Sequence, residues 1–165
     1  MTDLNVLKMF IAKDLRGLEE VICAPTPAMD AFTLAAWAVK DDEESVLRLA
    51  LQHCDPLHSN SMLLRQAVEF GSNQCFNILL PISNPTDNKS EALQWAIYYD
   101  RVKMFNQLIK VCNIADAVDE IDSGYDGVLL QRAHMILDEQ KAFAQAHRIE
   151  NELENISTSR PTKKI

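Results

Sequence analysis

The chain has 165 residues, 47% of them hydrophobic, which is enough for one compact domain with a sizeable core. Its formal net charge of -8 argues against a nucleic acid as partner, because binding to phosphates needs clustered Lys and Arg. The charge is explained most simply by solubility, although it also suits a basic partner protein. Only four glycines are available for tight turns between strands, so the composition favours helix over sheet.

The cysteines indicate a reducing environment. Cys23, Cys54, Cys75 and Cys112 form no C-x-x-C pair, and Cys75 falls at an apolar position. The N-terminus has no basic segment before its apolar residues, as a secretory signal would, and no stretch approaches the roughly 18 apolar residues that cross a membrane. We therefore expect a cytoplasmic monomer without a membrane partner, or a protein of a host cytosol if the chain is a secreted effector.

A 29-residue repeat is the strongest pattern in the chain. Ala38, Ala67 and Ala96 recur at this spacing, each with an apolar residue three places earlier and two apolar pairs after it in the same frame. Apolar residues placed in this way predict two helical faces separated by a short turn. The period therefore predicts an all-α fold of stacked helical hairpins, in which each pair buries its apolar side only against its neighbours.

In chain order, the frame predicts helix pairs near residues 2–24, 33–54, 62–83 and 91–112. The turns within the last three pairs are marked by the acidic run 41–44, by Gly71 and by Asp100-Arg101. Carboxylates in the acidic run suit the start of a second helix, whose dipole favours negative charge. Gly71 fits a helix end that needs a left-handed residue.

Beyond residue 112 the period is interrupted. Residues 115–127 form an acidic insertion, and we interpret its segment 122–127 as a solvated loop. Residues 128–155 return to a helical pattern, and a break near Asp138 would make them a fifth pair, which we favour over one long helix. Residues 1–156 thus form one repeat domain, and we expect the polar tail 157–165 to be disordered.

The repeated unit resembles the ankyrin repeat. That family carries a T-P-L-H-x-A-A segment, a glycine, and then apolar V-V and L-L pairs in a second, antiparallel helix. The matching residues are Thr33, Ala35, Ala38, Val46, Leu47, Ala50 and Leu51 in one unit, Leu64, Ala67, Gly71, Cys75, Phe76, Leu79 and Leu80 in the next, and Leu93, Ala96, Met104, Phe105, Leu108 and Ile109 in the third.

The chain also departs from that pattern. No T-P-L-H is intact, only one unit keeps the glycine, and the period is shorter than the family's period of about 33 residues. The missing residues come from the loop between repeats, where the family carries a β-hairpin finger. The resemblance therefore implies an ankyrin-like solenoid of about five stacked hairpins with short or absent fingers. Another helical-hairpin solenoid is the alternative.

The sequence contains no recognisable catalytic or metal-binding motif. The four histidines show no metal-ligand spacing, and there is no glycine-rich phosphate loop. His53 precedes Cys54, but a nucleophile and its base must approach in space and need an orienting group. The acidic segment 122–127 lacks the alternation and the closing glutamate of a calcium loop. We therefore expect no enzyme activity, no cofactor and no metal.

The family resemblance implies the candidate site. In ankyrin repeats, first-helix residues beside the conserved leucine and alanine line a concave, partner-binding face. The equivalent residues in this chain are Trp37, Lys40, Asp41, Gln66, Glu69, Phe70, Trp95, Tyr98 and Tyr99. The two tryptophans share one repeat position and are either binding anchors or core side chains between adjacent helices. We expect Tyr98 and Tyr99 to be partly exposed, since both lie by a turn.

These observations favour a non-catalytic protein-protein interaction module that binds a partner protein through the concave face. Such a module could serve as a bacterial effector, an inhibitor or an adaptor. One alternative is an acidic charge mimic that blocks a basic nucleic-acid-binding protein, which predicts carboxylates aligned on one face. Another is an enzyme whose site is not visible as a linear motif.

Overall fold

The computed structural model describes residues 3–25, 27–121 and 124–158, and these residues form helices joined by turns, with no strand among them. The expectation of an all-α fold is therefore confirmed. The helices are α1 (Asp3–Ala12), α2 (Leu15–Ile22), α3 (Ala31–Lys40), α4 (Glu44–Ala50), α5 (His58–Phe70), α6 (Asn73–Leu79), α7 (Asp87–Tyr98), α8 (Val102–Leu108), α9 (Ile114–Asp119) and α10 (Val128–Thr158).

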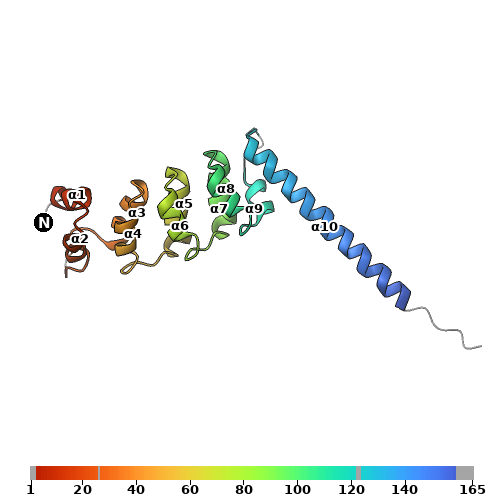
Figure 1. Cartoon of the computed structure of the whole chain (residues 1–165), viewed down its shortest axis with the longest axis horizontal. Helices are drawn as coiled ribbons and strands as arrows, with labels where there is room; N and C mark the ends of the chain where they lie inside the picture. The colour runs from red at the N-terminus through yellow and green to blue at the C-terminus, as the bar shows by residue number, and fades with distance from the viewer. Residues whose placement is uncertain (1–2, 26, 122–123, 159–165) are drawn as a thin grey trace, which may run out of the picture.

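The helices up to α8 form helix–turn–helix pairs that lie side by side in a row (Figure 1). Within the pairs, α3 packs on α4, α5 on α6 and α7 on α8. Between pairs, α3, α5, α7 and α9 contact one another in succession, and α2, α4 and α6 form a second series. Ala38, Ala67 and Ala96 are completely buried where these helices meet, so the small side chains of the repeat lie where backbones approach closely.

The turn inside each pair repeats as strictly as the alanines. Lys13, Asp42, Gly71 and Asp100 occupy one position of four successive units, and all have positive φ, between 52° and 75°. The N–H of the residue after each one donates to a carbonyl five residues back, with N···O distances of 2.8–2.9 Å. This left-handed ending closes the first helix in all four pairs, although only one of the four residues is the glycine that favours it.

The loops between pairs also follow the repeat. Asp55, Asn84 and Asn113 occupy equivalent positions in three successive loops, and the side-chain oxygen of each accepts the N–H two residues on, at 2.9, 3.2 and 3.1 Å. After the first two of these turns, residues 59–61 and 88–90 adopt left-handed φ before α5 and α7 continue in the right-handed sense. Short Asx turns thus take the place of longer connections.

The C-terminal part differs from the sequence prediction in two ways. Helix α9, which the sequence did not predict, begins just before the acidic insertion, packs on α7 and buries Ile114, Ala117 and Val118. The expected break near Asp138 is wrong, because α10 continues unbroken from Val128 to Thr158 and packs on α9 near its start. No glycine or proline interrupts this segment, so the helix has no reason to end there.

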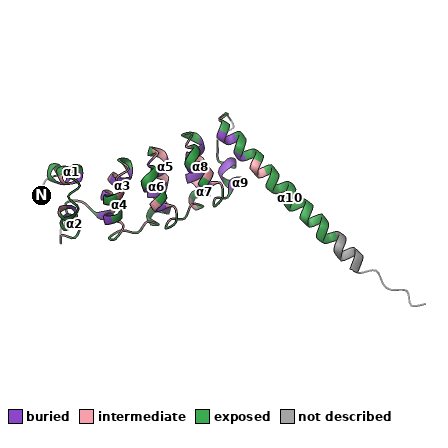
Figure 2. Cartoon of the chain, viewed as in Figure 1, coloured by how far each residue is buried: buried purple, intermediate pink, exposed green. Residues whose placement is uncertain are grey.

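Beyond its first turns, α10 projects away from the row of pairs (Figure 2). Its buried residues are Leu129, Leu130 and Ala133, whereas every residue from 138 to 152 is exposed. Ser157 and Thr158 of the predicted tail belong to α10, and its remaining residues lie outside the described part. Over the described residues, none of the helices combines the length and apolarity needed to cross a membrane.

Candidate protein-binding face

The nine predicted site residues lie in the last turns of α3, α5 and α7 and just beyond them. We call this set the first-helix face. Phe70, Tyr98 and Tyr99 are 42%, 41% and 45% exposed, which agrees with the expectation for the two tyrosines. Lys40 and Asp41 are also exposed. The other four residues are half-buried: Trp37, Gln66, Glu69 and Trp95.

The N-terminal part of this face is a small pocket. The rings of Trp37 and Phe10 meet edge to face, with centroids 5.9 Å apart and an interplanar angle of 89°. Leu7, Lys40 and Asp41 complete a cavity of about 190 Å³. Trp37 therefore packs between neighbouring helix pairs and also lines the surface, so neither of the two sequence interpretations alone describes it.

The C-terminal part is an aromatic cluster on α7. The rings of Trp95 and Tyr99 are 5.6 Å apart, and the Arg101 guanidinium lies 5.8 Å from the Tyr99 ring centroid. Arg101 also donates to the main-chain oxygens of Val68 and Glu69 at 3.2 and 2.7 Å. One side chain thus caps the carboxyl end of α5 and supports an exposed ring on α7.

Tyr125 joins this cluster from outside the repeats. Its ring lies 5.0 Å from that of Tyr98, and its hydroxyl donates to the Ile97 carbonyl at 2.9 Å. The loop before α10 therefore contributes to the face. Sequence reasoning placed Tyr125 in a solvated acidic loop, and no periodic signal could have brought it here because it lies after the interruption of the repeat.

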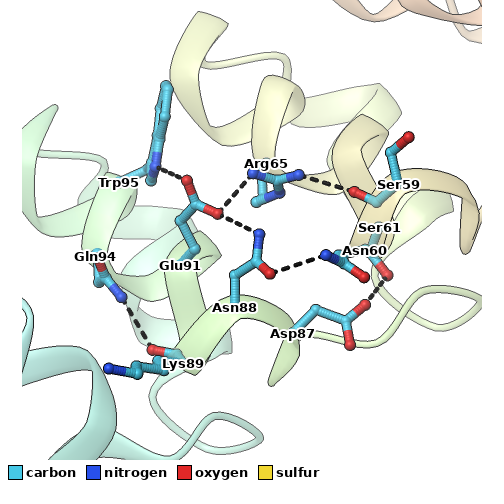
Figure 3. A network of polar contacts seen from close by, with 10 residues as sticks. All are labelled: Ser59, Asn60, Ser61, Arg65, Asp87, Asn88, Lys89, Glu91, Gln94 and Trp95. Carbon is cyan, nitrogen blue, oxygen red and sulfur yellow. Dashed lines mark hydrogen bonds and ion pairs between the residues drawn. The ribbon is translucent and has the colours of Figure 1, made fainter.

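The indole of Trp95 is fixed by a carboxylate, as Figure 3 shows. Glu91, one turn earlier on α7, accepts a hydrogen bond from Trp95 Nε1 at 3.1 Å. Its other oxygen accepts from Arg65 at 2.6 Å and from Asn88 at 2.8 Å. Because Arg65 lies on α5, this carboxylate joins two neighbouring pairs and holds Trp95 in one orientation.

The same network continues away from the tryptophan (Figure 3). Arg65 donates to the Ser59 carbonyl at 2.9 Å, and the Asn60 amide donates to Asn88 Oδ1 at 2.9 Å. Both asparagines are in the left-handed turns that open α5 and α7. Nothing in the sequence indicated this network, because a left-handed turn of three non-glycine residues has no established pattern.

Gln66 occupies the repeat position of the two tryptophans, between them in sequence. Its buried Oε1 has no hydrogen-bond partner within the described part of the chain. No described ring contact or hydrogen bond joins Trp37 directly to Trp95. The face therefore has two aromatic clusters, one around Trp37 and one around Trp95, and the face residues of the middle pair lie between them in sequence.

The acidic run near the first-helix face has structural partners. Asp42 accepts the N–H groups of Gln74 and Cys75, at 3.0 and 2.9 Å, and so caps α6 of the next pair rather than α4 of its own. Glu43 pairs with Lys13 at 2.7 Å, and Glu44 with Arg48 at 2.8 Å. Asp42 and Glu43 thus join neighbouring turns and helices, whereas the Glu44–Arg48 pair lies within α4.

No metal site is formed by the described residues: they contain no group of three His, Cys, Asp or Glu side chains arranged to hold an ion. All four cysteines are free thiols. Burial raises the pKa of Cys75 and of Cys112 to about 12, and burial together with Asp30 and Asp55 raises the pKa of Cys54. These three thiols are therefore poor nucleophiles at neutral pH.

Comparison with known proteins adds no relative to this description: no protein-family model, curated sequence or solved structure matches the chain significantly.

Proposed function

We propose that this chain is a non-catalytic protein-binding module, an ankyrin-like solenoid that binds a partner protein through the first-helix face. The observation that carries this proposal is the recurrence of exposed aromatic side chains at one repeat position. Phe70 and Tyr99 occupy equivalent positions at the ends of neighbouring first helices, and each is nearly half exposed. Rigid, half-exposed aromatic rings are the side chains that most often anchor protein interfaces.

Rigidity supports the proposal as much as exposure does. Arg101 spans α5 and α7 beside Tyr99, and Glu91 fixes the indole of Trp95. A partner would therefore meet side chains that have already lost much of their conformational freedom, which lowers the entropy cost of binding. We place the module in a reducing compartment, the cytoplasm or a host cytosol, because all four cysteines are free. An effector, an inhibitor or an adaptor would each use such a face.

A pair of double variants tests the proposal. Phe70→Ala with Tyr99→Ala removes the exposed rings, whereas Ile82→Ala with Val111→Ala removes two similarly exposed apolar side chains beyond the second helices. The two control residues also share one repeat position, so each variant alters a single position in two successive units. Both leave Trp95 in place, because its indole belongs to the Glu91 network and its removal would disturb the fold.

Each variant serves as bait for cytosolic proteins of the source organism and of any host, with recovery quantified by mass spectrometry. We expect the face variant to lose a protein that wild type and the control variant both retain, by at least about tenfold, as for removal of an interface hot spot. Equal recovery by all three baits, with matching circular dichroism spectra, would refute the first-helix face as the binding surface.

A further inference from the structure

Cys23 and His53 bring a thiol and an imidazole together from neighbouring helix pairs. Cys23 directly follows α2, and its Sγ lies 3.7 Å from Nδ1 and 3.8 Å from Nε2 of His53, which is in the turn after α4. Glu19, one turn earlier on α2, has Oε1 3.9 Å from His53 Nε2. We propose that Cys23 is a reactive thiol that exchanges with small disulfides, with His53 as proton acceptor and Glu19 as the group that holds the imidazole.

The cysteine in contact with His53 is not its neighbour in sequence. His53 precedes Cys54, but the structure places its ring against Cys23, which belongs to the preceding helix pair. The structure thus brings a base beside the Cys23 thiol and places a carboxylate 3.9 Å from the ring of that base.

The other three thiols have environments that suppress reaction. Cys75 is buried, and its thiol donates to the Ala38 carbonyl at 3.5 Å. Cys112 is half-buried and donates to the Pro85 carbonyl at 3.2 Å. Cys54 is half-buried near the carboxylates of Asp30 and Asp55. Cys23 is the exposed cysteine, and the group in contact with its sulfur is a base.

Proton transfer is the step that this arrangement assists. A thiol attacks only as its thiolate, so the S–H proton must leave before or during attack. The proposed reactivity depends on transfer of that proton to His53, whose ring is in contact with the sulfur. Both ring nitrogens lie 3.7–3.8 Å from the sulfur, so the ring has to turn before one of them points at the thiol.

The proposed reaction is thiol–disulfide exchange with a low-molecular-weight disulfide, such as oxidised glutathione. Cys23 Sγ attacks one sulfur of the disulfide, and its proton passes to His53. A new S–S bond joins Cys23 to that sulfur while the original S–S bond breaks, and the second sulfur leaves as a thiolate with the bonding electron pair. Cys23 is oxidised to a mixed disulfide and the released thiolate is the reduced product. The adduct would lie where the first two helix pairs meet.

The test uses the full chain carrying Cys54→Ser, which leaves Cys23 and the two thiols with strongly raised pKa. Oxidised glutathione and an aromatic disulfide serve as probes, with intact-mass and peptide mapping. We expect one fast adduct at Cys23, at least about tenfold slower in His53→Gln. His134→Gln, which alters an exposed histidine on α10, is the matched control and should leave the rate unchanged. An unchanged rate in His53→Gln, or a fast adduct at another cysteine, would overturn the proposal.

Chemical rescue separates proton transfer from a structural role. Added imidazole should restore at least part of the rate in His53→Ala and leave Cys23→Ser unreactive. Slow modification of Cys75 and Cys112 in the same samples reports that each variant is folded. If the His53 variants unfold, Glu19→Gln is the variant that tests the proposal. Glu19 lies on an exposed helix surface, so its substitution should not disturb the fold. We expect a rate about threefold lower in that variant, since the imidazolium loses its carboxylate; an unchanged rate would then contradict the proposal.

Discussion

The hydroxyl of Ser61 accepts a hydrogen bond from the backbone N–H of Asn84 at 3.0 Å, and the same contact recurs between Ser90 and Asn113, also at 3.0 Å. Both serines are buried, and each joins a first helix to the loop that ends its own repeat unit and begins the next one. The contact is therefore a polar joint that recurs in two successive units of the stack.

Ser61→Ala and Ser90→Ala should each destabilise the fold. The substitution leaves a partly buried N–H without its acceptor, which costs about 1 kcal/mol. Ser61→Ala should cost more, because Ser61 also donates to Asp87 at 2.8 Å. Urea unfolding followed by circular dichroism measures the change, with the exposed Ser45→Ala as control. Midpoints equal to that of Ser45→Ala would show that the joint contributes nothing.

Gly71→Ala should lower stability by about 1–2 kcal/mol, because a Cβ is unfavourable at φ 75°. The new Cβ would also lie 2.8–2.9 Å from atoms of the Arg101 guanidinium, which would have to move. The combination with Arg101→Ala separates the two effects, since a steric contribution makes the double variant less unstable than the sum of the singles. Unaltered urea midpoints in Gly71→Ala would contradict this account of the turn.

Asp42 and Asp100 occupy the same position of the turn, with φ 55° and 52°, but only Asp42 is seen to cap a helix. Asp100→Gly should stabilise the fold by up to about 1 kcal/mol, because glycine relieves the left-handed backbone. Asp42→Gly gains the same relief and loses the cap of α6, which is worth about 1 kcal/mol. Thermal midpoints of the two variants should therefore differ, and equal midpoints would show that the Asp42 carboxylate adds no stability.

Stability should fall in alkaline solution because of Cys75 and Cys112. Burial raises the pKa of both thiols from 9.0 to about 12, so above pH 9 the unfolded chain releases protons that the folded chain retains. Their contribution to the free energy of unfolding is thus complete below pH 9 and is lost as pH rises toward 12. Tyrosines and lysines titrate in the same range, so the readout is the difference between wild type and Cys112→Ala. Parallel stability profiles would contradict the prediction.

The helical pairs could be predicted because their signal is a buried alanine at fixed spacing. Ala38, Ala67 and Ala96 are completely buried and mark where the helices pack together. The turns were harder to recognise. The left-handed conformation is expected at Gly71, but the sequence gives no sign of it at Lys13, Asp42 and Asp100. Helix α9 was missed because its apolar residues are interspersed with acids, and the period that would have revealed them had already ended.

The candidate site was predictable where it follows the repeat and hidden where it does not. Trp95 and Tyr99 lie one helical turn apart, so their contact follows from the predicted helix. Glu91 lies one turn before Trp95, so its proximity also follows from the predicted helix. The hydrogen bond between the two side chains does not, because no periodic pattern indicates it. Tyr125 and Cys23 reach their partners through tertiary packing alone, which a single sequence does not encode in any local pattern.

The exposed part of α10 should be less stable than the stacked helix pairs. From residue 138 to 152 no side chain is buried, so this segment keeps its helix through local propensity and surface pairs such as Arg148–Glu152, at 3.2 Å. Isolated helices of this length are marginal in water. Amide hydrogens there should exchange much faster than those of α7 in native-state hydrogen exchange, and mild heating should melt this arm while the stacked pairs stay folded. Binding of a partner to this arm would therefore carry an entropy cost for ordering the helix, whereas binding to the first-helix face would not.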